Sequence, residues 1–189
     1  MNIVISNEGL SRANKALSHI RGGFPRAVAA AVNRTLESMK TDITAETKKR
    51  YFAKPSDIRK TLTPKRANGT KMQGILISRG GHRKLQDYKL TPKTPQKGRQ
   101  TVFKGAVKRD GGLKPMPEAF MMDTPNAGFV LFIRIGSGRA WRNIKHVSSP
   151  AIPQIIKNQE TVNAVQTHAE QVFEERLTHE TRRLLNLLP

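Results

Sequence analysis

Apolar residues recur in two stretches of the chain at the three- and four-residue spacings of an amphipathic helix. The first stretch runs from about Pro25 to Tyr51, and its stripe consists of Val28, Val32, Leu36, Met39 and Ile43. The second runs from about residue 160 to 188, and its stripe consists of Val162, Val165, Ala169, Val172, Phe173, Leu177, Leu184 and Leu188. Both patterns predict long helices with one buried face. The second helix would measure about 43 Å, so it would either project beyond a small sheet or pack on another subunit.

The longest apolar run lies between two glycines, Gly128 and Gly136, and it predicts a buried central strand. We expect the rest of the chain to be organised around this strand, with 119–122 as its neighbour across a turn. Further strands are predicted at residues 2–5, 72–78, 101–107 and 144–147. The predicted fold class is therefore α+β, with a small antiparallel β-sheet flanked by a long N-terminal helix and a long C-terminal helix.

Shorter helices and a long basic loop complete this prediction. The first is expected from Ser6 or Asn7 to about Ile20, with Leu10, Leu17 and Ile20 facing inward. The second is expected from about residue 55 to Leu62, and Pro64 closes it. A third, short helix is expected around residues 152–156. Residues 80–100 combine glycine, proline and many cations, which is typical of a long loop or extended arm. We expect one domain spanning 1–189, with a lysine-rich loop or arm at about 80–115.

The positive charge of the chain is concentrated in its middle. Of the formal net charge of +20, residues 51–118 contribute +13, from seventeen Lys/Arg against four Asp/Glu. Such a field attracts polyanions, either nucleic acid or an acidic protein. Contacts of this kind need only charge within reach, so they would not depend on base sequence. The candidate contact residues are Lys65, Arg66, Lys71, Arg79, Arg83 and Lys84.

No pattern in the sequence indicates a catalytic or metal site, and we predict no enzyme and no cofactor. The absence of cysteine excludes disulfides, thiolate metal ligands and cysteine nucleophiles. His168 and His179 lie eleven residues apart on the second long helix, and solvent-facing side chains are the simpler interpretation. The turn at 136–139 lacks the spacing of a phosphate-binding loop. We also expect no membrane partner, because no window approaches the roughly 18 apolar residues of a membrane span.

Four segments of the chain carry a family resemblance. They are residues 24–35 (FPRAVAAAVNRT), 51–60 (YFAKPSDIRK), 149–156 (SPAIPQII) and 173–180 (FEERLTHE). Together they resemble the prophage minor tail protein Z family of long-tailed phages (siphoviruses). These motifs are compositional and carry no chemistry, and the resemblance does not extend to the lysine-rich residues 80–115.

The resemblance implies a virion structural protein, a tail completion protein that joins the head-proximal end of the tail to the neck. It implies a homo-oligomeric ring of six copies (a hexamer) around the DNA path, assembled in the host cytoplasm. The implied partners are the tail tube, tail terminator and head–neck connector proteins, with the basic middle near packaged DNA or an acidic ring. The candidate helix interface consists of Val28, Val32, Leu36, Met39, Val172, Phe173, Leu177 and Leu184. The alternative is a free, sequence-nonspecific nucleic-acid-binding protein.

Overall fold

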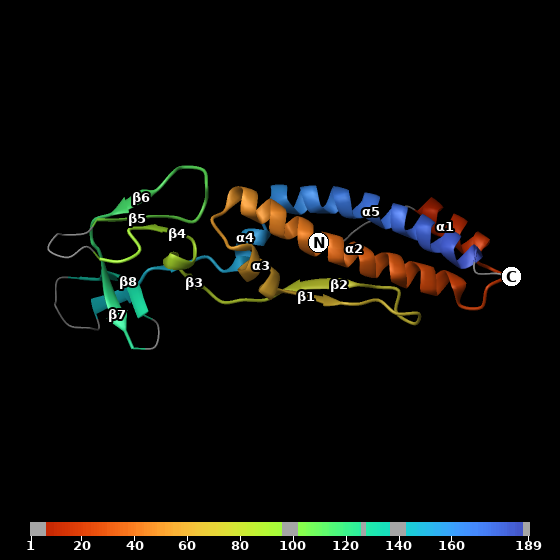
Figure 1. Ribbon diagram of the computed structural model, residues 1–189, viewed down its shortest axis with the longest axis horizontal. Coiled ribbons are helices and arrows are strands. Elements are labelled where there is room, and N and C mark those ends of the chain that lie inside the picture. The colour runs from red at the N-terminus through yellow and green to blue at the C-terminus, as the bar shows by residue number, and fades with distance from the viewer. Residues whose placement is uncertain (1–6, 96–101, 126–127, 137–142, 187–189) are drawn as a thin grey trace.

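Two long helices lie side by side along much of the molecule (Figure 1). They are α2 (Gly23–Arg50) and α5 (Gln159–Leu185), and both were predicted. Asn158 caps α5, because its side-chain oxygen accepts hydrogen bonds from the backbone N–H groups of Glu160 and Thr161 at 3.1 and 3.4 Å. The second long helix was expected to project beyond a small sheet or to pack on another subunit. Instead, α5 packs on α2 of the same chain.

The computed structural model describes residues 7–95, 102–125, 128–136 and 143–186. Its remaining helices are α1 (Asn7–Ala16), α3 (Pro55–Thr61), α4 (Ile152–Ile156) and the 3-10 turn η1 (Leu85–Asp87). The predicted first helix is confirmed, although it ends at Ala16. The strand predicted at residues 2–5 lies outside the described residues. No helix in the described ranges combines the length and apolar character that crossing a membrane requires.

The helices share two apolar cores. One core joins α1, the first half of α2 and the end of α5, and its buried members are Ala13, Leu17, Ala27, Val28, Ala31, Phe173, Leu177 and Leu184. The other joins the second half of α2 to α3, α4 and the start of α5, and it includes Leu36, Met39, Ile43, Ile58, Ile152, Ile155, Val165 and Ala169. The described members of the predicted stripes are therefore buried or half-buried, and the two helices share both cores. Leu188 lies outside the described residues.

The strands form four small antiparallel sheets within the described ranges, where the sequence predicted one. Their bounds are β1 (Leu62–Lys65), β2 (Ile75–Ser78), β3 (Arg83–Lys84), β4 (Lys89–Thr91), β5 (Phe103–Ala106), β6 (Lys114–Met116), β7 (Ala119–Thr124), β8 (Gly128–Arg134), β9 (Ile144–His146) and β10 (Ser148–Ser149). The sheet orders are β1–β2, β10–β3, β4–β5–β6 and β7–β8–β9. The antiparallel pairing of β7 with β8 was predicted and is confirmed.

Strand β8 is the middle strand of its sheet, but it is not the centre of the molecule. Only Val130 and Leu131 in it are buried, and Phe129 remains 44% exposed. The physical reason is that the helices bury their apolar faces against each other. The strands must then build a separate small core, made of Leu85, Leu90, Phe103, Ala119 and Leu131.

Two segments form strands where the sequence predicted other structure. Residues 83–91, expected in a long loop, form β3, η1 and β4. Pro64, expected to close a helix, lies in β1 opposite Leu76. A proline is tolerated there because the two-stranded sheet has only edge strands, whose outward N–H groups need no partner in the sheet.

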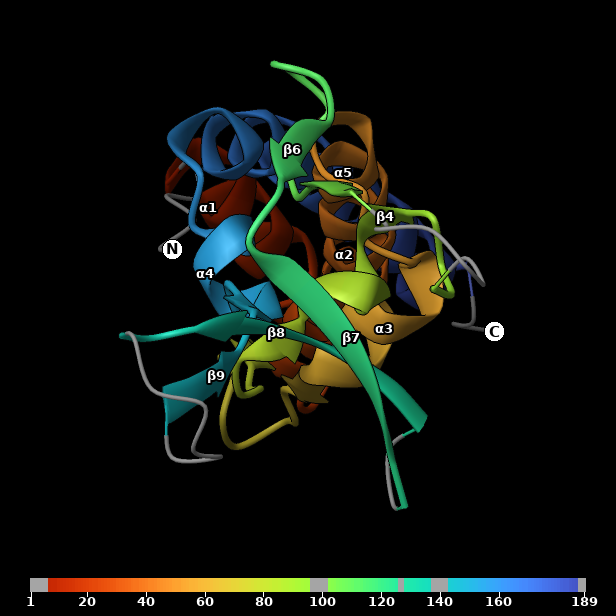
Figure 2. The same ribbon diagram turned by 90° about the vertical axis from the view of Figure 1, so that its left-hand side faces the viewer.

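The molecule is elongated, with a helical body and a strand lobe at opposite ends (Figure 1). We define the helical body as α1–α5 with the β1–β2 hairpin, and the strand lobe as the described residues of 83–149. Figure 2 views the molecule from the lobe, with β7 and β8 in front of the helices. The two parts meet at the end of α2, where the Phe52 N–H donates to the Val107 carbonyl at 2.9 Å and the Arg109 N–H donates to the Arg50 carbonyl at 2.8 Å.

Candidate functional site

The six predicted contact cations do not form one patch. Lys65, Arg66 and Lys71 lie at the end of the β1–β2 hairpin where the two strands are connected. Arg79 follows β2 at the opposite end of the hairpin, because the register pairs Leu62 with Ser78. Two further members, Arg83 and Lys84, form β3 in the strand lobe. The set is therefore divided among the two ends of the hairpin and the strand lobe.

Two of the six cations are already paired with carboxylates. Arg83 contacts Asp57 of α3 at 2.8 Å and Asp87 at 3.2 Å, and its side chain is only 28% exposed. These contacts tie the strand lobe to α3. Arg66 contacts Glu37 of α2 at 3.0 Å, with both side chains largely exposed. The other four make no ion pair within the described residues. Arg83 is therefore a structural residue first, because its charge is largely balanced inside the protein.

A cavity of about 320 Å³ lies beside Arg83. It is lined by Thr61, Gly80, Gly81, His82, Arg83, Lys84, Asp87 and Ile152. Its walls carry both signs of charge, and Nδ1 of His82 lies 3.4 Å from the Ser149 carbonyl oxygen. In the described ranges, no group of three or more histidine, aspartate or glutamate residues converges as metal ligands would. Among the described residues that line this cavity, no hydrogen bond joins a base to a nucleophile.

Most of the candidate helix-interface residues pack inside the chain itself. Val28, Leu36, Met39, Phe173, Leu177 and Leu184 are buried, and Val32 and Val172 are half-buried. Contact between these helix faces and a partner protein stays a prediction.

An apolar groove of about 860 Å³ runs beside these residues, between α2, α4, α5 and β2. Val32, Leu36 and Phe173 contribute to its walls, and Met72 and Ile75 on the hairpin side are 43% and 45% exposed. The hairpin approaches α2 closely at Gly74, where a Cβ atom would lie 2.6 Å from Cγ1 of Val32. Glycine is therefore required for the hairpin to lie against α2 as it does.

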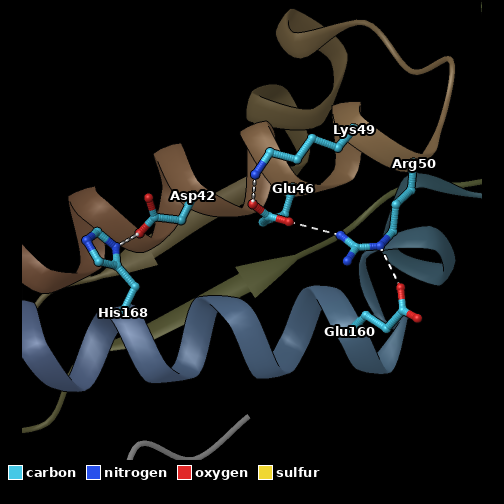
Figure 3. Close-up of polar contacts among 6 residues, drawn as sticks. All are labelled: Asp42, Glu46, Lys49, Arg50, Glu160 and His168. Atoms are coloured by element: carbon cyan, nitrogen blue, oxygen red, sulfur yellow. Dashed lines mark hydrogen bonds and ion pairs between the residues drawn. The ribbon is translucent and has the colours of Figure 1, made fainter.

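A polar junction holds the two long helices together (Figure 3). It consists of Asp42, Glu46, Lys49, Arg50, Glu160 and His168. Arg50 donates to Glu46 through Nη1 at 2.9 Å and to Glu160 of α5 through Nε at 2.8 Å. Both hydrogen bonds raise the pKa of Arg50, and the bond to Glu160 contributes the larger share. Lys49 also donates to Glu46, and His168 Nδ1 lies 2.8 Å from Asp42.

Several lysines of the strand lobe were missed as contact candidates, because their segment was interpreted as a loop or as an unremarkable strand. Lys89 of β4 and Lys104 of β5 are exposed, and neither makes an ion pair within the described residues. The signal that identifies them is alternation. Lys89 and Thr91 flank buried Leu90, and Lys104 separates buried Phe103 from buried Gly105. A period of two places the lysines on the solvent face of a half-buried strand.

A family model described as prophage minor tail protein Z (GPZ) matches residues 8–188. That range includes both long helices and the strand lobe, and it contains the four segments that carried the resemblance. No curated protein and no solved structure matches the chain.

Proposed function

This chain belongs to the prophage minor tail protein Z family, and from that premise we propose that it completes the head-proximal end of a phage tail and joins it to the neck. Membership makes the chain a minor tail protein and a structural component of the virion. We further propose that six copies form a ring around the DNA path. Each copy would be one domain with a basic arm, assembled in the host cytoplasm.

The observation that carries this proposal is the separation of the helical body from a basic strand lobe (Figure 1). Among the described residues of 83–149 there are ten Lys/Arg against four Asp/Glu. The described residues of the helical body hold twenty against ten, so both parts are positively charged and attract anionic partners. An elongated subunit with two separate parts can contact different partners at once, as a joining protein must. The tail tube, the tail terminator and the head–neck connector proteins are the partners that this position implies.

The test is to mix the purified protein with tails that lack it. Light scattering gives the mass of the protein alone, and negative-stain imaging shows what it does to the tails. We expect closed rings of one size and added density at one end of the tube, and we expect only the treated tails to join heads. Tails that already carry their neck are the control, because their end is occupied and they should gain no density.

A protein that stays monomeric and leaves tails unchanged would overturn the proposal. If that monomer bound duplex DNA tightly, the free nucleic-acid-binding alternative would replace it. Heads and tails that join equally well without the protein would also exclude a joining role.

A further inference from the structure

One face of the β4–β5–β6 sheet is open to solvent and carries unpaired positive charge. The register pairs Lys89 with Ala106, Thr91 with Lys104, and Lys104 with Pro115. Residues paired across an antiparallel sheet point to the same face. These five residues therefore share one face, and all are exposed except half-buried Ala106.

The opposite face of the same sheet is the one that holds the strand lobe together. Leu90, Phe103 and Gly105 are buried on it, and Met116 packs against the core of the lobe. A Cβ atom at Gly105 would lie 2.7 Å from Cδ2 of Leu85. Lys114, paired with Gly105, is the exposed residue of this face. Because the other four residues pack in the strand lobe, the lysine face is left free for a partner.

The lysine face has no carboxylate to balance it. Lys89 and Lys104 lie on adjacent strands in a diagonal relation, roughly 7–8 Å apart at the backbone. Lys93 and Lys108, just beyond the ends of β4 and β5, are also exposed, and none of these four lysines makes an ion pair with a described residue. The described carboxylates between 88 and 118 are Asp110 and Glu118, which lie in turns outside the sheet. Like charges this close repel each other, so the face favours an anionic partner.

We propose that this lysine face, centred on Lys89 and Lys104, binds the phosphate backbone of double-stranded DNA. The proposal rests on the proposed position of the protein around the DNA path. The DNA contact is thereby assigned to a sheet face instead of to the six cations predicted from the sequence, of which Arg66 and Arg83 are ion-paired. Small neighbours such as Thr91, Ala106 and Pro115 leave the ammonium groups accessible to phosphates.

The composition of the face selects this partner over others. Binding of single-stranded nucleic acid relies on aromatic side chains that stack with bases, and the face has none. A stable protein interface centres on buried aromatic or aliphatic anchors, and these are also absent. Contact with duplex phosphates needs only accessible cations, and it is independent of base sequence.

The test measures the affinity of the full chain for a fluorescent 30-base-pair duplex at salt concentrations from about 50 to 300 mM. Each phosphate contact contributes about 0.9 to the slope of log affinity against log salt. The double variant Lys89→Gln/Lys104→Gln should lower that slope by about two and weaken binding roughly 10- to 100-fold near 0.1 M salt. The variant Lys89→Arg/Lys104→Arg keeps the charge and should keep the slope.

The matched control is Lys65→Gln/Lys71→Gln, which removes the same charge from the hairpin. We expect it to change the slope by less than half as much. An equal or larger effect of the hairpin pair would overturn the proposal, as would wild-type protein that does not bind the duplex. Thermal unfolding by circular dichroism confirms that each variant is folded.

Tail joining by the same variants separates this inference from the proposed function. If the sheet variant binds duplex like wild type but no longer joins tails, the face contacts an acidic protein and the DNA assignment is wrong. If the wild-type protein and the variants show the expected slopes but the wild-type protein never joins tails, DNA binding by the lysine face is supported and the joining role is wrong.

Discussion

Arginine and lysine have different roles in this protein. Arg50, Arg83 and Arg109 each bind two groups at a junction between elements. Arg109 donates through Nε to the Lys48 carbonyl at 2.8 Å while its guanidinium lies 4.6 Å from the Phe52 ring centroid. A planar guanidinium suits such double contacts, whereas an ammonium is a strongly hydrated point charge. Exposed lysines such as Lys89 and Lys104, by contrast, present their charge to solvent.

Replacing Glu46 with glutamine tests the junction between α2 and α5 and its pH dependence. The hydrogen bond from Lys49, aided by the one from Arg50 and opposed by burial, holds the pKa of the Glu46 carboxyl below its ordinary value. Its contribution to stability is therefore complete above the ordinary carboxylate pKa of about 4.3 and is lost as pH falls through the folded-state pKa. We expect Glu46→Gln to lower the free energy of unfolding by about 0.5–1 kcal/mol at pH 7 and to have little effect below about pH 3.

Urea titrations at the two pH values measure this effect, with Glu175→Gln as the matched control. Glu175 is exposed on α5 and makes no ion pair with a described residue, so its replacement should change little at either pH. A Glu46→Gln effect of the same size at pH 7 and pH 3 would show that the lost stability is not due to the ionised carboxylate.

At the scale of elements, small residues allow the long helices to pack closely. Ala31 of α2 and Ala169 of α5 are both completely buried, and each lies in one of the two helical cores. Short side chains at such positions let neighbouring backbones approach, and larger ones force side chains or backbones to shift. The alanine content of α2 therefore contributes to packing as well as to helix propensity.

Ala169→Leu tests this close packing. The extra atoms have no space at a fully buried position, so we expect the free energy of unfolding to fall by about 1–3 kcal/mol. The same substitution at Ala164, which is exposed on the same helix, should change it by less than about 0.5 kcal/mol. Thermal and chemical unfolding compare the two variants directly. Equal effects would mean that the α5 surface at Ala169 is not tightly packed.

At the scale of the whole molecule, a small junction connects the helical body to the strand lobe. Besides the contacts of Arg109, it includes the Arg83–Asp57 ion pair at 2.8 Å. It also includes a hydrogen bond that the Tyr88 hydroxyl donates to the Pro150 carbonyl at 2.7 Å. Burial raises the pKa of Tyr88, which keeps this hydroxyl protonated as a donor. These contacts, the two backbone hydrogen bonds at the end of α2 and the packing of Tyr88 in the helical core hold the two parts in position.

Arg109→Ala should loosen the junction without unfolding either part. Removing the guanidinium deletes one hydrogen bond and one cation–π contact, worth together about 1 kcal/mol at a partly exposed site. We expect roughly fivefold faster amide hydrogen exchange in 103–109, with the exchange of α2 and α5 unchanged. The control is Lys108→Ala, whose exposed side chain makes no ion pair within the described residues. Faster exchange throughout both helices would show instead that Arg109 supports the whole fold.

Short strands were the least predictable elements. β3 is two residues long and pairs with β10, so Lys84 lies opposite Ser148 from a distant part of the chain. A pairing of this kind leaves no local pattern, because neither strand is long enough to show alternation. Leu85 and Leu90 are core residues of the strand lobe, yet in sequence they are single apolar residues among cations. This is why a loop was predicted for their segment.

The sequence by itself determined the two long helices, their apolar stripes, the β7–β8 pair, the positive charge of the middle and the family. All of these depend on local periodicity, turn residues or composition, which a single chain displays directly. Only the tertiary structure decided that α5 packs on α2, that the described strands form four sheets, and that Arg66 and Arg83 are ion-paired with described residues while Lys89 and Lys104 are not. Those outcomes depend on which distant side chains meet, and no spacing along the chain contains that information.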